Sequence, residues 1–176
     1  QGEVYTMEEL LLGLLLESGN DCAEAIAEHI SGSNEEFAKL MNKKAIQLGA
    51  TNTNFKNPSG LTEEGHLTTA HDLALIMRYA SQNADFVRIS QTPYHFYENH
   101  PFSDGSEKWA TNHNHLLKDD SQYKYEYAYC GKTGYTTAAN HSYTAVAKKD
   151  DQTIIGAFLN ATDKDGLYTS VGQLFD

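Results

Sequence analysis

The chain has 176 residues, 40% of them hydrophobic and 21% charged, which is ordinary for a globular protein with one core or two small lobes. Its formal net charge of -11 argues against nucleic acid and anionic membrane surfaces as partners, because both carry negative charge. The longest apolar stretch, residues 10–16, is too short to span a membrane.

The first two predicted helices follow directly from capping signals. Thr6 and Glu9 have the spacing of a capping box, and the leucine-rich run behind them predicts a helix that is apolar nearly all round and therefore buried. Asn20 or Asp21 is expected to cap the next helix, which should end at Gly32. The stretch from Ser18 to Asn20 would then lie in a tight connection between two helices.

Three more helices are expected before residue 92. Ser33 begins a second capping box, and the helix behind it should end at Gly49. Residues 50–68 lack periodicity and predict a long loop, of the kind that usually serves a function or wraps a lobe. Thr69 and Asn83 should cap two further helices. The side chains expected to face inward on the helix after Ser33 are Phe37, Leu40, Met41, Ile46 and Leu48. The helix after Thr69 should contain Leu73, Leu75, Ile76, Met77 and Tyr79.

The second half of the chain favours strands. Residues 93–97 read as a short edge strand, 99–110 as a loop, and 111–117 as a turn followed by one helical turn. Three strands are expected over 128–133, 142–148 and 153–161, with a turn at Asp150 and Asp151 making the last two an antiparallel hairpin, and a helix should begin near Gly166. The predicted fold class is α+β, with a helical lobe over 1–92 and a sheet-bearing lobe over 93–176.

Two short motifs carry the candidate chemistry. Lys132 and Thr133 stand where a strand runs into a bend, and an ammonium beside a hydroxyl suits a carboxylate; Gly134 leaves the backbone open to a ligand. The other motif is Ser18-Gly19-Asn20, which equally fits a helix stop followed by a helix cap.

The cysteines and histidines predict no cofactor. Cys22 and Cys130 each lie two residues from one motif, so they are either neighbours across one cleft or two separate buried thiols. His113 and His115 are not accompanied by ligands at zinc-site spacing. We therefore expect no metal.

Taken together, these stretches resemble the D-alanyl-D-alanine carboxypeptidases, the low-molecular-weight penicillin-binding proteins of the serine peptidase type. The resemblance runs nearly end to end, and its joint order and spacing carry the assignment. The matching residues are Tyr5, Thr6, Glu8–Leu11, Leu16, Ser18–Asp21, Phe37, Met41, Asn42, Leu48, Gly49, Thr51, Thr53, Phe55, Asn57, Pro58, Gly60, Leu61, Thr68–Ala70, Asp72–Ala74, Asn112, Asn114, Leu116, Leu117 and Gly131–Gly134.

The resemblance implies a penicillin-binding-protein or β-lactamase-like transpeptidase fold, in which a cleft separates a helical lobe from a five-stranded antiparallel sheet flanked by helices. It implies acyl transfer through a serine ester on peptidoglycan stem peptides ending in D-Ala-D-Ala, inhibition by β-lactams, and action in the bacterial cell envelope outside the cytoplasm.

The same resemblance implies a role for each residue of the two motifs. Ser18 would relay a proton to the leaving amine, and Asn20 would bind the substrate amide. Lys132 would supply positive potential, and Thr133 would bind the terminal carboxylate. The backbone N–H of Tyr135, beyond Gly134, would donate to the oxyanion.

Two departures from the family pattern stand out. No Arg follows the last predicted strand, so either Lys164 replaces it or Thr133 and Lys132 act alone. The nucleophile motif Ser-x-x-Lys occurs only as Ser121 to Lys124, in the wrong order and in a polar stretch, which we read as chance. We expect the natural protein to begin before Gln1, the 176 residues to be an inactive fragment, and its incomplete sheet to pair with another chain.

Two alternatives remain open at this point. A β-lactamase would need a general base for deacylation, and Glu63 and Glu64 lie in the long loop. A non-catalytic module that binds peptidoglycan or a protein partner would describe the chain if the natural protein also lacks Ser-x-x-Lys.

Overall fold

The computed structural model describes residues 2–176, which fold into six helices and two antiparallel sheets. The elements in chain order are α1 (Met7–Leu16), α2 (Asn20–Ser31), α3 (Asn34–Gln47), α4 (Ala70–Ala80), α5 (Ala84–Gln91), β1 (Tyr94–Phe96), β2 (Trp109–Thr111), β3 (Ala128–Thr136), β4 (Asn140–Lys149), β5 (Gln152–Ala161) and α6 (Lys164–Phe175).

Helix α1 begins as predicted and α2 does not. Thr6 accepts from the backbone of Glu9 in a complete capping box. The expected side-chain cap of α2 by Asn20 or Asp21 is wrong, because Gly19 is the N-cap residue and gives no side-chain bond. The all-round burial of α1 is also wrong. Its neighbours α2, α5 and β2 cover only part of its surface, so among its leucines only Leu12 and Leu16 are buried.

The inward face predicted for α3 is only partly right. Phe37, Met41 and Leu48 are half-buried, but Leu40 and Ile46 are exposed, and the fully buried residues are Ala38 and Ala45. The physical reason is that α3 packs chiefly along α2, and small side chains let the two helices approach closely. Its N-cap, Ser33, is as expected.

Helices α4 and α5 begin at the predicted caps, Thr69 and Asn83. Of the large apolar and aromatic side chains on α4, Met77 is fully buried and Tyr79 is exposed. The loop over 50–68 is anchored to α4 by the buried Asp72, whose Oδ2 accepts from the Asn52 N–H and the Thr53 hydroxyl, both at 2.8 Å.

The edge strand predicted near residue 94 is confirmed as β1, but the loop predicted over 99–110 contains the start of its partner β2. The helical turn expected before Leu117 is wrong. That segment is a turn in which buried Asn112 and Asn114 bond to nearby backbone, including Asn112 Nδ2 to the Ser90 oxygen at 2.7 Å.

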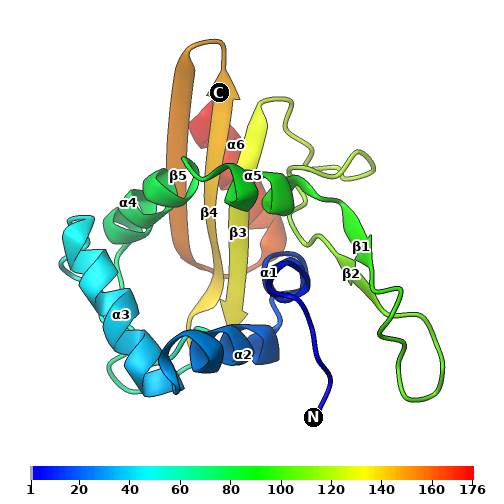
Figure 1. Ribbon diagram of the computed structural model, residues 1–176. Helices are drawn as coiled ribbons and strands as arrows, with labels where there is room; N and C mark the ends of the chain where they lie inside the picture. The colour runs from blue at the N-terminus through cyan, green and yellow to red at the C-terminus, as the bar shows by residue number, and fades with distance from the viewer. Residues whose placement is uncertain (1) are drawn as a thin grey trace.

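The main sheet has the order β3-β4-β5 and helices on both faces, as Figure 1 shows. On one face, Leu167 and Val171 of α6 pack against alternate residues of β4, beginning with Tyr143. On the other face, Met77 of α4 and Val87 of α5 pack with Cys130 and Val146. The predicted α+β class with a flanked antiparallel sheet is confirmed. The resemblance implies five strands, and the sheet formed by residues 2–176 has three.

The two cysteines belong to different parts of the interior. Cys130 lies in the cluster between the sheet and α4 and α5, whereas the Cys22 sulfur lies against Gly13 of α1. Both are free thiols, and burial raises the pKa of each to about 11. The thiols are therefore separate, as one of the two interpretations has it, but only Cys130 is buried and Cys22 is half-buried.

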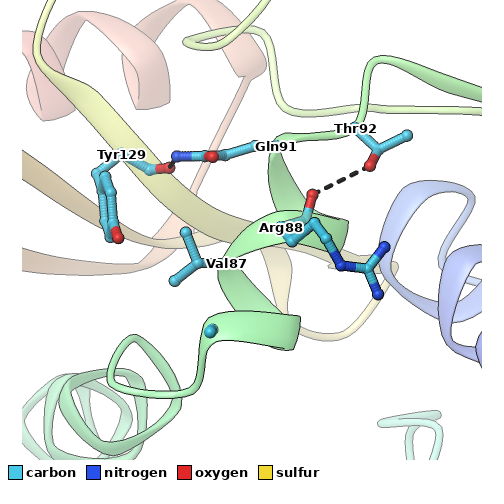
Figure 2. A pocket seen from close by; sticks show the side chains of 6 residues that line it. Val87, Arg88, Gln91, Thr92 and Tyr129 are labelled. Carbon is cyan, nitrogen blue, oxygen red and sulfur yellow. Dashed lines mark hydrogen bonds between the residues drawn. The ribbon is translucent and has the colours of Figure 1, made fainter.

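Helix α5 also covers part of the outer edge of β3. Figure 2 shows the Gln91 amide donating to the backbone oxygen of Tyr129, at 2.7 Å, beside an open hollow of about 340 Å³ lined by Val87, Arg88 and Thr92. One backbone acceptor at this edge is therefore already occupied.

Candidate active site

The two predicted motifs meet in space. Lys132 Nζ, on β3, donates directly to the hydroxyl of Ser18, in the connection between α1 and α2. The same ammonium donates to the backbone oxygen of Thr133 at 2.8 Å. A helix connection and a strand more than a hundred positions later in the chain thus share one polar contact.

Ser18 is held in an unusual backbone conformation. Its φ of 58° is in the left-handed region, which is costly for a residue with a side chain. The Gly13 oxygen accepts from the backbone N–H of both Glu17 and Gly19, at 3.2 and 3.1 Å, and fixes the bend. A Cβ on Gly19 would lie 3.0 Å from the Cys22 sulfur, so the connection packs tightly against the helices on either side.

Glu17 ties this connection to the segment after β2. Its carboxylate accepts from the backbone N–H of Thr111 and lies 3.0 Å from His113 Nε2. The backbone N–H of His113 also donates to the Leu16 oxygen, at 3.3 Å. The Ser18 bend is therefore supported from two directions.

Burial lowers the pKa of Lys132 to about 8, because the surrounding protein disfavours the charged ammonium. A lysine in this range exchanges its proton near neutral pH, as a group taking part in acid–base chemistry must.

The glycines around Lys132 are required by the pairing of β3 with β4. A Cβ on Gly131 would lie 2.8 Å from the backbone oxygen of Thr144, and one on Gly134 would lie 2.8 Å from the Ser142 hydroxyl. Beyond them the strand opens to solvent, and Tyr135 is exposed. Gly134 is exposed as well.

A small cavity of about 50 Å³ adjoins Thr133 and Gly134. Its lining includes three basic side chains from separate elements, His113, His141 and Lys164. Sequence reasoning identified Lys164 but missed both histidines. The local signal for His113 was its place between two asparagines that are buried, which turns its own side chain outward.

The long loop reaches the end of the same strand. The hydroxyl of Thr62 donates to that of Thr136, at 3.1 Å. Glu63 follows directly, but its carboxylate accepts from the Asn57 amide at 3.0 Å within the loop.

The remaining predicted residues are placed as follows. Asn20 is exposed at the first position of α2, one residue from Gly19. Ser121 lies in a turn closed by a bond from the Lys124 N–H to the Ser121 oxygen, and the Lys124 ammonium pairs with Asp119 at 2.5 Å. This Ser-x-x-Lys does not open a helix, which agrees with its reading as chance.

Within residues 2–176, no group of three or more His, Cys, Asp or Glu side chains is arranged to hold a metal ion. None of the helices in that same range combines the length and the apolar character needed to cross a bilayer.

Comparison with known proteins shows what the chain is similar to. The family model for D-alanyl-D-alanine carboxypeptidase matches residues 1–163. The chain is 39% identical to D-alanyl-D-alanine carboxypeptidase DacF of Bacillus subtilis, covering 99% of this chain and 43% of that protein. It is 37% identical to DacB2 of Mycobacterium tuberculosis, covering 99% and 58%. The chain thus spans about half the length of these relatives.

A crystal structure of an evolved putative penicillin-binding protein homolog from Mycobacterium tuberculosis superposes with a TM-score of 0.86 at 37% identity. The superposition covers 99% of this chain and 65% of that one. The three-dimensional likeness therefore extends over the whole described fold.

Proposed function

Because the chain belongs to the D-alanyl-D-alanine carboxypeptidase family, we propose that its protein is a serine-type enzyme that removes the terminal D-alanine from peptidoglycan stem peptides. A serine oxygen attacks the carbonyl carbon between the two D-alanines, the C–N bond breaks, and water hydrolyses the resulting ester. β-Lactams imitate the D-Ala-D-Ala end and form the same ester. The substrate places the enzyme in the bacterial cell envelope, outside the cytoplasm.

The observation that carries the proposal is the contact between Ser18 and Lys132. It joins two motifs that lie far apart in the sequence, and we place the substrate cleft beside it, between a helical lobe, 1–92, and a sheet-bearing lobe, 93–176. Ser18 relays the proton to the leaving amine, with its hydroxyl bonded to a lysine whose pKa is near 8. Asn20 binds the substrate amide from the first turn of α2.

The strand side of the cleft binds the acyl group and the carboxylate. The backbone N–H of Tyr135 donates to the oxyanion, an interaction worth about 3 kcal/mol in acyl transfer. Thr133 donates its hydroxyl to the terminal carboxylate. Lys164 supplies positive charge in the adjoining cavity, which His113 and His141 also line and where the family resemblance leads one to expect an arginine.

The attacking serine is not Ser121. Its turn conformation and the pairing of Lys124 with Asp119 give it neither a helix nor a free lysine base. The nucleophile therefore belongs to a Ser-x-x-Lys outside these 176 residues, and the 176 residues by themselves form no acyl-enzyme.

Mass spectrometry after incubation with a labelled penicillin tests this. The full-length protein should gain one label on a serine outside this sequence, and a protein of these 176 residues should gain none. Labelling of Ser121 would refute the assignment. No labelling of the full-length protein would instead favour a non-catalytic peptidoglycan-binding module.

A β-lactamase is distinguished by the fate of the ester. The contact of Thr62 with Thr136 brings Glu63 close to the end of β3, where a deacylating base would be needed. Because Glu63 is engaged by Asn57, we expect slow deacylation. The penicillin ester should therefore last much longer than the time that the free enzyme needs to turn over one peptide substrate.

A further inference from the structure

A second, larger cavity lies on the other side of the Ser18 bend. Its volume is about 430 Å³, and it opens between α1, α2 and the β1–β2 ribbon. Glu17, Gly19 and Asp21 line it, and these alternate along the chain with Ser18 and Asn20. The connection between α1 and α2 therefore borders the candidate active site and this cavity at once.

Aromatic rings line the mouth of this cavity and continue along the ribbon. Trp109 and Phe102 line the cavity itself. Trp109 also contacts Phe96 and Tyr94, with ring centroids 4.7 and 5.7 Å apart. The alternation of the strands places Tyr94, Phe96 and Trp109 on one face of the ribbon, where they are 61%, 37% and 45% exposed. Such a contiguous exposed aromatic surface marks a binding site more often than a structural need.

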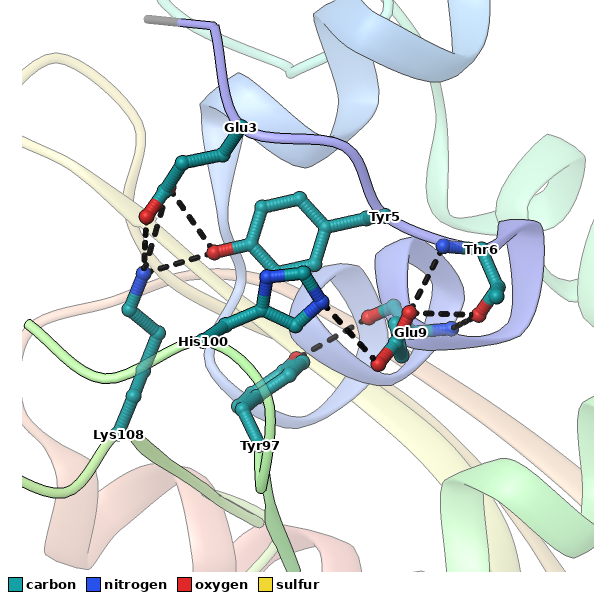
Figure 3. A network of polar contacts seen from close by, with 7 residues as sticks. All are labelled: Glu3, Tyr5, Thr6, Glu9, Tyr97, His100 and Lys108. Carbon is teal, nitrogen blue, oxygen red and sulfur yellow. Dashed lines mark hydrogen bonds and ion pairs between the residues drawn. The ribbon is translucent and has the colours of Figure 1, made fainter.

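The charges in the cavity disfavour an anionic ligand. Among the described residues that line the cavity, Lys108 is the only basic one. The Lys108 ammonium is already bonded to the Tyr5 hydroxyl at 2.7 Å and to Glu3 at 3.3 Å, as Figure 3 shows. Fixed carboxylates face the rest of the cavity. Phospholipid headgroups, nucleotides and peptide carboxylates would all be repelled.

The carboxylates are held in place by partners of their own. Glu9 accepts from the backbone of Thr6 at 2.7 Å and lies 3.5 Å from His100 Nε2, also shown in Figure 3. Asp21 accepts from the Cys22 N–H at 2.9 Å. Preset acceptor oxygens beside exposed ring faces match a ligand with apolar C–H faces and many hydroxyl and amide donors.

We propose that this cavity and the aromatic face of β1 and β2, defined by Tyr94, Phe96 and Trp109, bind a neutral N-acetylhexosamine glycan. Pyranose rings stack on the aromatic side chains, and their hydroxyl and acetamido groups donate to the carboxylates. The identity of the glycan as the peptidoglycan strand rests on the proposed function. A protein acting on stem peptides meets that strand close to the cleft, and Glu17 joins the ribbon to the Ser18 bend.

The sole tryptophan of the sequence, Trp109, provides a direct readout. An oligomer of β-1,4-linked N-acetylglucosamine, titrated into the full-length protein, should change the tryptophan emission saturably. A Trp109→Phe variant subtracts any signal from tryptophans outside these residues. Tyr94→Ser should weaken binding by about tenfold, equivalent to about 1.4 kcal/mol.

The matched control is Tyr79→Ser, because Tyr79 is also an exposed tyrosine but lies on α4. It should leave sugar binding unchanged, and a thermal melt verifies that both variants fold. Equal weakening by both substitutions would overturn the proposal. So would the absence of saturable binding, or binding that free lysine or a diamine abolishes, since that would identify the site as one for cations.

The outcome is independent of the catalytic proposal. Saturable sugar binding without penicillin labelling would support the glycan site and refute the carboxypeptidase activity. Penicillin labelling without sugar binding would support the carboxypeptidase activity and refute the glycan site.

Discussion

Lys132 belongs to the candidate site, and its burial destabilises the folded protein. Burial lowers the pKa of its ammonium from the ordinary 10.5 to about 8, a cost on the order of 3 kcal/mol to the folded state at pH values where the group is charged in both the folded and the unfolded chain. Below pH 8 both states hold the proton and the full cost applies. From pH 8 to 10.5 only the unfolded state holds it, so stability rises with pH.

Replacing Lys132 with Met should therefore stabilise the protein at pH 7 while abolishing penicillin labelling. The gain in unfolding free energy should shrink as the pH is raised toward 10, because the wild type then no longer buries a charge. Urea unfolding at pH 7 and pH 10 measures both effects. A variant less stable than the wild type at pH 7 would show that the ammonium contributes more through its bonds to Ser18 and Thr133 than it loses by burial.

The role proposed for Lys164 separates binding from chemistry. If it attracts the terminal carboxylate, Lys164→Ala should raise KM for a D-Ala-D-Ala peptide by about tenfold, the equivalent of one lost charge-assisted bond, with kcat little changed. Lys164→Arg, which keeps the charge, should remain close to wild type. Steady-state kinetics on the full-length protein makes the comparison, with Lys43→Ala, an exposed lysine of α3, as the neutral control. A fall in kcat alone would contradict this role.

At the scale of elements, the pairing of β3 with β4 depends on two glycines that differ in what they contact. A Cβ at Gly131 would strike backbone, at 2.8 Å from the Thr144 oxygen, whereas one at Gly134 would strike only the Ser142 hydroxyl. Backbone cannot move aside without breaking the ladder, but a side chain can rotate.

Gly131→Ala should accordingly cost about 1–3 kcal/mol of unfolding free energy, and Gly134→Ala should cost less. Adding Ser142→Ala should recover most of the loss at Gly134 and none of the loss at Gly131. Chemical denaturation of the single and double variants tests the difference. Equal rescue of both glycine variants would show that the close contacts do not set the cost.

Asp72 links α4 to the long loop. Burial acts to raise its pKa, but the bonds from Thr53 and Asn52 outweigh it and hold the pKa of this carboxyl below its ordinary value. A carboxyl with a lowered pKa contributes stability above about pH 4, the value expected in the unfolded chain, and loses it as the pH falls through the lower folded value.

Asp72→Asn should lower the melting temperature by several degrees at pH 7 and weaken the dependence of stability on pH below 4. Asp85→Asn, in the first turn of α5 and exposed, is the matched control and should change stability by no more than about 0.5 kcal/mol. Calorimetry at pH 7 and pH 3 distinguishes them. An equal effect of the two substitutions would contradict the anchoring role of Asp72.

The sequence predicts those elements that are determined by interactions between residues close together in the chain. Helix starts at Thr6, Ser33, Thr69 and Asn83 depend on a side chain bonding to its own turn, so the sequence predicts them. The inward face of α3 depends on which helix it meets, and no local pattern contains that. Strand β2 was missed because three residues in a polar stretch become a strand only by pairing with β1.

The same distinction applies to the site. The Ser18 and Lys132 motifs were identified from the sequence, and the family resemblance implies roles for both on one substrate, which is a long-range constraint that local patterns lack. The cavity beside Thr133 was not identified, since His113, His141 and Lys164 come from a turn, a strand and a helix. Nothing in the spacing of those residues along the chain indicates that they converge.

At the scale of the whole molecule, the two edges of the main sheet differ. The outer edge of β3 is partly covered by Gln91. Strand β5 has β4 as its only partner strand within residues 2–176, and Ile154 and Leu159 on it are exposed. An uncovered strand with exposed apolar side chains is a template for pairing with another chain.

We therefore expect a protein of these 176 residues to associate through β5 as its concentration rises. Light scattering across a concentration series measures the association. Ile154→Lys should reduce it, because a charge on an edge strand opposes pairing, whereas Ile30→Lys, an exposed isoleucine on α2, should not. Mass that stays monomeric at every concentration would contradict the expectation. An equal response to both lysines would point to net charge instead of the strand, because either substitution moves the chain from -11 toward neutrality by the same amount.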